Sequence, residues 1–329
     1  MIVFFNDVRK ADYITAKEQL ERFIARKEPA LARMVARETS RLGASISYDD
    51  ITNALLSGDI SEEWLEKWRE LYSEFIVSSL VPVWKEAFLA SVVAMEERYP
   101  KFLFDPNTKA IQEWVADRGA MLVTNVVEQQ REAIRGVVGQ ALQIGSNMTV
   151  DELAKVIRPM VGLYPAQAVA NLKYYNFVKS GMIERHPRTN MEKITERAQR
   201  AAAKYAGTQH RARAMTIART ELAEAYNMGE YQSILQAQEK NYIGKMKKGI
   251  ISARDERVCD FCKSMDVRVR GYLELEEAMH NPRGVKSYTD GLTPPFHPRC
   301  RCAVVYEEVE PPVPFVSNEQ TNSIPVVQY

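Results

Sequence analysis

This chain of 329 residues has few cysteines, almost no net charge and no long apolar segment. With 44 Lys and Arg against 43 Asp and Glu, its formal charge is +1, so no strong overall field draws it to one class of partner. No segment is expected to be long enough to span a bilayer, and the apolar start Met1–Phe5 is too short for a signal peptide. The composition therefore predicts an ordinary globular protein, made in a reducing cytoplasm and without a membrane partner.

The four cysteines all lie in the C-terminal quarter, as the pairs Cys259/Cys262 and Cys300/Cys302. Without an export signal, cysteines at such close spacing are better interpreted as metal ligands than as disulfides. His297 adds a fifth donor, three residues before Cys300. Two distant pairs of soft ligands are the usual form of a structural zinc site, so we predict bound Zn²⁺.

Five donors compete for four positions. Cys259 and Cys262 are the first two residues that we assign as ligands. Cys300 is the third, because it can pair with either His297 or Cys302. The spacing of His297 and Cys300 matches that of the first pair, which slightly favours three cysteines with His297, but a site of four cysteines fits nearly as well. A closed set of protein ligands predicts a metal that stabilises a small module rather than one that catalyses. We therefore expect no enzymatic activity and no catalytic residue.

Apolar residues recur every three or four positions over most of the first 240 residues, which predicts a mainly α fold. The wide apolar face from Trp64 to Ile76 is expected in the core, although a partner-binding surface would show the same pattern. Pro29 is expected to divide or kink the first helix, and Pro82 to interrupt the second. The predicted helices cover Asp12–Leu42, Ser61–Tyr99, Asn107–Ile144, Thr149–Pro159 and Pro165–Gly181.

After Asn241 the helical periodicity fades, and short β-like runs appear at Gly249–Ile251, Val267–Val269 and Ala303–Tyr306. A Pro-rich end without periodicity follows and is expected to be extended. The predicted regions are an N-terminal helical region (1–105), a second helical region (106–240), a zinc-binding α+β module (241–310) and a flexible tail (311–329).

Basic residues gather between Glu184 and Arg219, where nine Lys and Arg face three Glu. A basic helix face can bind DNA phosphates, but it is equally the solvated side of an amphipathic helix. Few aromatic residues accompany it, so base recognition is not expected. The candidate DNA contacts are Arg197, Arg200, Lys204, Arg211 and Arg213.

Three motifs together resemble those of one family. Ala218-Arg219-Thr220-Glu221, followed by Ala225-Tyr226-Asn227-Met228-Gly229, is similar to the A-R-T-E…A-x-N-x-G helix of phage head morphogenesis proteins of the phage Mu F-like minor head family. That family continues with D-x-R-V-C-x-x-C and P-P-x-H-P-x-C-R-C, which stand here as Asp255–Cys262 and Pro294–Cys302. The resemblance covers about Ile111–Val309, and departs at Ile250, where the family often has Trp.

The resemblance implies a minor head protein of a tailed phage, lying inside the head near the portal and present in the host cytoplasm during assembly. It implies the portal protein as partner, with scaffold or major capsid protein and double-stranded DNA as further partners.

Two alternatives stay open on the sequence: a zinc-dependent nucleic-acid-processing enzyme and a DNA-binding zinc module. The first lacks the H-x-E and P-C-x-x-C pattern of zinc deaminases, and the second lacks a helix after the last ligand pair. Arg219 and Glu221 could suggest an ADP-ribosyltransferase site, but on a helix they point in different directions. We predict a structural role for both, such as an ion pair that anchors the zinc module to the helices.

Overall fold

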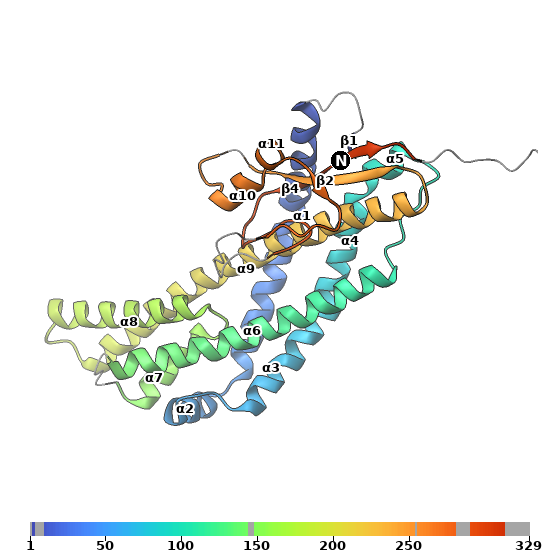
Figure 1. The fold of residues 1–329 in the computed structure, drawn as a ribbon. Helices are drawn as coiled ribbons and strands as arrows, with labels where there is room; N and C mark the ends of the chain where they lie inside the picture. The colour runs from blue at the N-terminus through green and yellow to red at the C-terminus, as the bar shows by residue number, and fades with distance from the viewer. Residues whose placement is uncertain (1, 4–9, 144–147, 254, 281–289, 313–329) are drawn as a thin grey trace, which may run out of the picture.

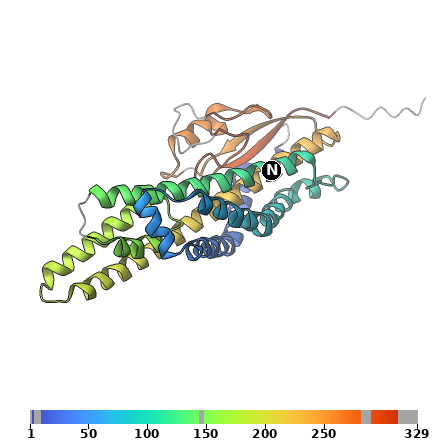
Figure 2. The same ribbon diagram turned by 90° about the horizontal axis from the view of Figure 1, so that it is seen from below.

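The computed structural model describes residues 2–3, 10–143, 148–253, 255–280 and 290–312. Long helices form an elongated body, and a small sheet lies against one end of it, beside α1 and α9 (Figures 1 and 2). The mainly α fold with a small C-terminal α+β part is thus as predicted. Most of the predicted tail, residues 313–329, lies outside the described residues.

The helical body runs from α1 to α9. Its helices are α1 (Lys10–Ser45), α2 (Tyr48–Ser57), α3 (Glu62–Phe75), α4 (Val81–Ser91), α5 (Val93–Arg98), α6 (Lys109–Gln143), α7 (Val150–Ile157), α8 (Pro165–Arg185) and α9 (Met191–Glu239). A π-helical turn (Ile76–Leu80) joins α3 to α4, and a 3₁₀ turn (Arg158–Met160) follows α7. The C-terminal part contains β2 (Lys245–Ile251), α10 (Asp260–Met265), α11 (Val267–Arg270), β3 (Leu273–Glu274) and β4 (Ala303–Glu310), and β1 is Ile2–Val3.

Both interior prolines stand within helical segments. Pro29 does not divide the first helix. It lies inside α1, which is one continuous helix of 36 residues. The apolar residues on either side of Pro29, among them Phe23 and Leu31, are buried, and this packing offsets the loss of one intrahelical hydrogen bond. Pro82 interrupts the next helix as expected: it occupies the first turn of α4, directly after the π-helical turn.

The predicted apolar face of α3 packs in the core, where Leu65, Trp68 and Tyr72 are buried. The helical run Glu62–Arg98 is also long and apolar enough to cross a membrane, with a window of mean hydropathy 1.5, so the expectation that no segment reaches that length is wrong. Trp84 and Phe88 of this run are buried in the core of the helical body, whereas Val77, Leu89 and Val93 are exposed.

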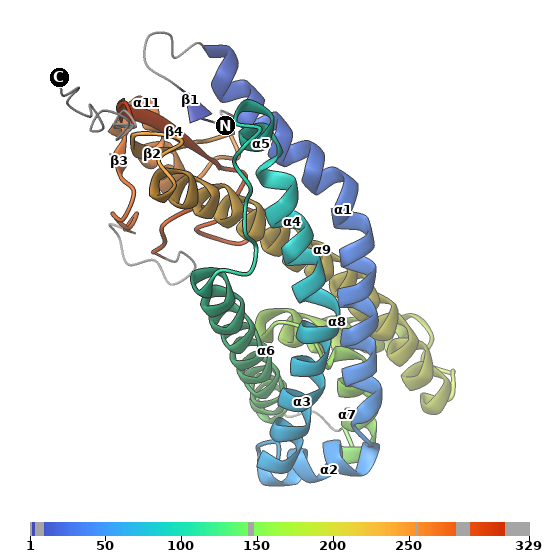
Figure 3. The same ribbon diagram turned by 90° about the vertical axis from the view of Figure 1, so that its right-hand side faces the viewer.

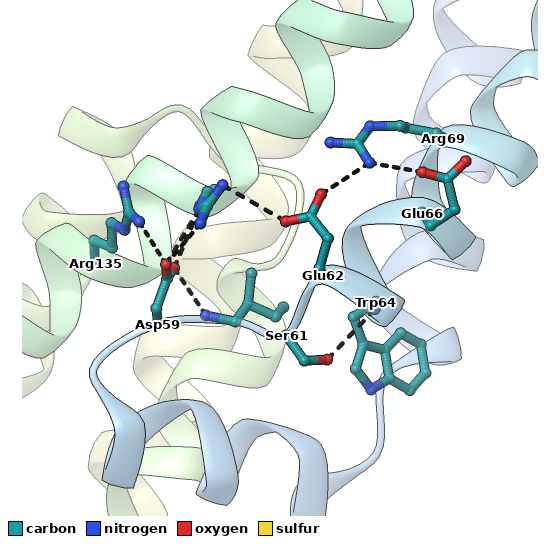
Figure 4. A network of polar contacts seen from close by, with 9 residues as sticks. Asp59, Ser61, Glu62, Trp64, Glu66, Arg69 and Arg135 are labelled. Atoms are coloured by element: carbon teal, nitrogen blue, oxygen red, sulfur yellow. Dashed lines mark hydrogen bonds and ion pairs between the residues drawn. The ribbon is translucent and has the colours of Figure 1, made fainter.

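A polar network holds the start of α3 against α6 (Figure 4). Ser61 caps α3 by accepting a hydrogen bond from the Trp64 amide, and Asp59, just before it, pairs with Arg131 at 3.0 Å and with Arg135. The cap satisfies one of the free amides at the helix start, and the ion pairs fix the direction in which α3 leaves the loop.

Helix α9 is the central element of the body, with 49 residues. It packs against α1, α4, α8 and β4, and Figure 3 shows α1 and α4 crossing it. One hydrophobic core includes residues from both predicted helical regions and from the sheet, for example Leu20, Trp84, Val127, Leu222 and Val304. The helices of 1–105 and 106–240 therefore share a core, while the predicted domain boundaries stay a prediction.

The sheet has the order β1-β4-β2-β3. β2 and β4 are antiparallel, with Lys248 opposite Tyr306 and Ile250 opposite Val304, which confirms the runs at Gly249–Ile251 and Ala303–Tyr306 as strands. The strand expected at Val267–Val269 is wrong, because these residues form α11. Asp266 caps that turn through its side chain and its carbonyl oxygen, and so overrides the β preference of the two valines. β1 pairs with β4 in parallel and was not expected.

Candidate metal centre

The first half of the centre is a tight turn around Cys259 and Cys262, here called the first knuckle. Cys259 caps α10, and its Sγ accepts a hydrogen bond from the Cys262 amide at 3.3 Å. The Cys259 carbonyl oxygen accepts another from Lys263 at 3.0 Å, so the turn is fixed at both ends. This geometry turns the two sulfur atoms of the knuckle to the same side.

The second knuckle is formed by His297, Pro298, Arg299 and Cys300. The Cys300 amide donates to the His297 carbonyl oxygen at 3.0 Å, and Arg299 adopts a left-handed backbone conformation with φ 60°. The His297 Nδ1–H donates to the Pro298 carbonyl oxygen at 2.9 Å, so Nε2 is the ring nitrogen that faces the sulfur atoms of the first knuckle. Metal-binding histidines are usually oriented in this way by a hydrogen bond from the other ring nitrogen.

The two knuckles meet with spacings that suit one metal ion. His297 Nε2 lies 3.4 Å from Cys259 Sγ and 3.3 Å from Cys262 Sγ, and Cys262 Sγ lies 3.8 Å from Cys300 Sγ. Ligands around a tetrahedral zinc would stand about 3.8 Å apart for two sulfurs and about 3.6 Å for sulfur and nitrogen. These contacts therefore have the spacings that neighbouring ligands of one soft metal ion would have.

All five predicted donors come together, in two overlapping groups that could each hold a metal ion. One consists of Cys259, Cys262 and His297, and the other of Cys262, Cys300 and Cys302, with the ligand atoms of each group within 4.8 Å of one another. Cys262 belongs to both groups. The structure therefore places His297 and Cys302 on opposite sides of a shared sulfur, and the choice between them stays a prediction.

The site lies in a small apolar cluster of its own. Cys262, Cys300 and Cys302 are almost completely buried, and Phe261 and Phe296 pack edge to face beside them at 5.3 Å. A hydrogen bond with Cys300 raises the pKa of the Cys262 thiol, and the same contact lowers the pKa of Cys300. Contact with Cys300 also raises the pKa of His297 to about 9. A metal ion would displace these protons, so binding at neutral pH would release them.

An ion pair ties the loop before the first knuckle to the residue after the second. Arg301 donates two hydrogen bonds of 2.6 Å to the two carboxylate oxygens of Asp255. This contact holds the pKa of Asp255 well below its usual range. A two-bond pairing of this kind fixes the relative orientation of both chain segments.

Arg299 attaches the centre to the helical body. Its backbone amide and its guanidinium donate to the hydroxyls of Thr220 at 3.3 Å and Thr216 at 2.7 Å, and the guanidinium also reaches the Ala212 carbonyl oxygen at 3.2 Å. The second knuckle thus rests on two turns of α9. A single sequence gives no signal for this contact, because its partners lie about eighty residues apart.

Comparison with known proteins gives one family for this chain. The model of the phage Mu protein F like family matches residues 132–305, which is more than half of the sequence and includes α9 and both knuckles. The chain belongs to the phage Mu F-like family. No curated protein and no solved structure matches it. The family is one of phage head morphogenesis proteins, which associates this chain with the phage capsid.

The segment of α9 that carries the family motif, Ala218–Gly229, is here called the Mu F-like signature. Each of its polar residues described below contacts a different element. Arg219 pairs with Glu28 of α1 at 3.5 Å, and Glu221 accepts two hydrogen bonds, of 3.0 and 2.7 Å, from Arg118 of α6. Asn227 accepts one from the Val304 amide of β4 at 3.1 Å. Arg219 and Glu221 do form ion pairs, but these pairs join α9 to other helices and not to the zinc module. The contact between α9 and the metal centre is made by Thr220 instead.

Gly229 ends the signature at the closest contact between α9 and α4. A Cβ atom there would lie 2.7 Å from Phe88 Cα and closer still to the Ser91 hydroxyl. We therefore expect Gly229→Ala to lower the free energy of unfolding by about 1–3 kcal/mol, because the two helices must move apart. Gly207→Ala, in the same helix but with open space at its Cβ, should stabilise by about 0.5–1 kcal/mol. Urea unfolding of both variants tests this, and equal effects would contradict it.

The predicted DNA contacts divide into two sets. Arg197, Arg200, Lys204 and Arg211 are exposed on α9, and DNA contact through them stays a prediction. Arg213 does not belong to that surface: it is buried, donates to Gln129 at 2.9 Å and to the Gly162 carbonyl oxygen, and lies 4.4 Å from the Tyr164 ring centre. Its position on the inner face of α9 explains the difference, since it follows Gln209, which is buried, by one helical turn.

Proposed function

We propose that this protein is a minor head protein, a structural component of a tailed-phage head that binds the portal vertex from the head interior. The observation that carries the proposal is how the family signature is used. Arg219, Thr220, Glu221 and Asn227 each connect α9 to another part of the chain. The signature residues thus build a rigid shape, which favours an assembly role over an enzymatic one.

Zinc is the metal ion that the centre fits best, because the donors are thiolates and one imidazole at tetrahedral spacing. We propose Cys259, Cys262, His297 and Cys300 as its ligands, since three contacts of 3.3 to 3.8 Å link these four. Cys302 is the alternative to His297. A zinc ion bound in this way has no open position for a substrate, and its contribution would be to folding.

The experiment that tests the proposal is a binding measurement between the full chain and the portal ring. Purified protein is mixed with portal rings of the same phage and followed by sedimentation velocity, in which we expect it to move with the rings. A parallel sample with duplex DNA and Zn²⁺ should show no cleavage. Failure to sediment with the portal, or metal-dependent cleavage of the DNA, would overturn the proposal.

A further inference from the structure

A cavity of about 220 Å³ lies between α6, α9 and the residues Pro295–Pro298 that lead into the second knuckle. Met121 and Asn125, which line it from α6, are exposed, whereas Tyr72 and Arg213, which also line it, are buried. The cavity therefore leads from the surface into the helical body. Its volume far exceeds what one water molecule needs, so a small organic ligand has room there.

Arg213 brings a buried positive charge to this cavity without a carboxylate to neutralise it. Its guanidinium donates to the Gln129 side chain at 2.9 Å and to the Gly162 carbonyl oxygen, and its Nε–H has no hydrogen-bond partner. Within the part of the chain that the structure describes, Arg213 forms no ion pair, although it is only 4% exposed. Buried charges are normally paired, so an anion in the cavity would supply the charge that the chain lacks.

The Tyr72 hydroxyl is a second hydrogen-bond donor in the same cavity. Tyr72 comes from α3, is 3% exposed, and makes no hydrogen bond through its hydroxyl to any residue that the structure describes. Burial raises the pKa of Tyr72, and the positive charge of Arg213 lies close enough to act against that shift. The hydroxyl therefore keeps its proton at neutral pH and can donate it in a hydrogen bond to an anion beside Arg213.

The rest of the lining favours a ligand with one negative charge and an apolar body. Glu221 and Glu224 follow Arg213 along α9 by about 12 and 16 Å, and both lie beside Arg118, which cannot neutralise two carboxylates. A ligand with several negative charges, such as a nucleotide, would be repelled at that end. Much of the remaining wall is apolar and consists of Met121, Leu122, Val126, Ile217, Pro295, Phe296 and Pro298.

We propose that this cavity binds a small organic acid whose single carboxylate is held by Arg213 and Tyr72. The apolar body of the acid lies against Met121, Ile217 and Phe296. Because Phe296 directly precedes the second knuckle, the metal centre supports one wall of the site. The site goes beyond the proposed function, since it requires neither the portal ring nor DNA.

Hexanoate and the uncharged hexanamide, which has nearly the same size and shape, test the site in the full chain. The protein is labelled with ¹³C in its Met and Ile methyl groups and titrated with each compound in NMR spectra. Hexanoate should shift the signals of Met121 and Ile217 in a saturable way and leave the signal of Ile51, a core residue of α2, unchanged. Hexanamide should bind at least about tenfold more weakly, because it forms no hydrogen bond through a charged group.

Two variants locate the carboxylate. Tyr72→Phe keeps the ring and removes the hydroxyl, and it should weaken hexanoate binding by at least about tenfold, the effect of one hydrogen bond to a charged group. Asn125→Asp adds a negative charge to the exposed part of the wall and should weaken binding by at least about threefold. The matched control is Asn53→Asp, exposed on α2 and not part of the lining, which should change binding by less than about twofold.

Three outcomes would overturn the inference: equal binding of hexanoate and hexanamide, shifts only in signals outside the cavity, or unchanged affinity in both Tyr72→Phe and Asn125→Asp. Circular dichroism of the variants should match the wild-type protein, because Tyr72→Phe keeps the buried ring and Asn125 is exposed. Sedimentation with portal rings should be the same for both variants as for the wild-type protein. The acid site and the proposed function therefore stand or fail separately.

Discussion

Cys262→Ser is expected to release the bound metal ion and to unfold the segment that carries the two knuckles, while the helical body stays folded. Cys262 is the one donor common to both metal-binding groups, so its loss affects the site whichever fourth ligand is used. Structural zinc supplies about 10–16 kcal/mol of apparent binding free energy in small modules at neutral pH, which exceeds what their cores provide. The apolar cluster here includes Cys262 itself, so little would hold the segment without the ion.

The measurements are the metal content of the purified protein by mass spectrometry and hydrogen exchange along the chain. We expect rapid exchange over the knuckle segment and unchanged exchange in α1, α6 and α9. His297→Ala and Cys302→Ser decide the fourth ligand: the proposed set predicts loss of metal in the first and retention in the second. A Cys262→Ser protein that keeps a full equivalent of zinc, or a wild-type protein that contains none, would contradict the assignment of the centre.

Arg118→Ala is expected to lower the free energy of unfolding by about 3–5 kcal/mol, the usual effect of removing one partner of a buried ion pair. Arg118 is mostly buried, and it lies 2.7 Å from Glu221 and 3.8 Å from Glu224, whose side chains are 3% and 15% exposed. Without the guanidinium, two buried carboxylates face each other. Lys109→Ala, which removes an exposed ion pair at the start of the same helix, should change stability by less than about 0.5 kcal/mol.

The loss in Arg118→Ala should also depend on pH. Burial already raises the pKa of Glu224 from 4.5 to about 7, against the lowering effect of Arg118. A carboxyl whose pKa is higher in the folded state stabilises that state while protonated, and this stability is lost as the pH rises through the folded pKa. The free energy of unfolding of the variant should therefore differ less from that of the wild-type protein at about pH 6 than at about pH 8. Urea unfolding at both values tests this, and a pH-independent difference would show that the carboxylates are not the cause.

Local patterns in the sequence predicted most of the helices, and they singled out the five Cys and His side chains that the structure brings together. Apolar spacing and caps such as Thr149 are properties of neighbouring residues, and two close ligand pairs have few other interpretations. The strand expected at 267–269 is wrong for an equally local reason: the cap at Asp266 favours a helical turn over the β preference of the valines.

What could not be predicted depends on residues far apart in the chain. Nothing near Glu221 indicates that its partner is Arg118, 103 residues earlier, or that Arg299 bonds to Thr216. Arg213 was assigned to the basic surface because charge suggests exposure, whereas its partners Gln129 and Gly162 come from other elements. Such contacts are fixed by the packing of α9 against the rest of the molecule.

The parallel pairing of β1 with β4 has a consequence for the order of events during synthesis. Ile2 and Val3 leave the ribosome long before their partners Tyr306 and Glu307, which are separated from them by nearly all the described elements. Helix α1 likewise packs on α9, which is made long after it. The apolar side of α1 therefore stays without its native partner until α9 has been made, and the sheet can close only after β4 has been made.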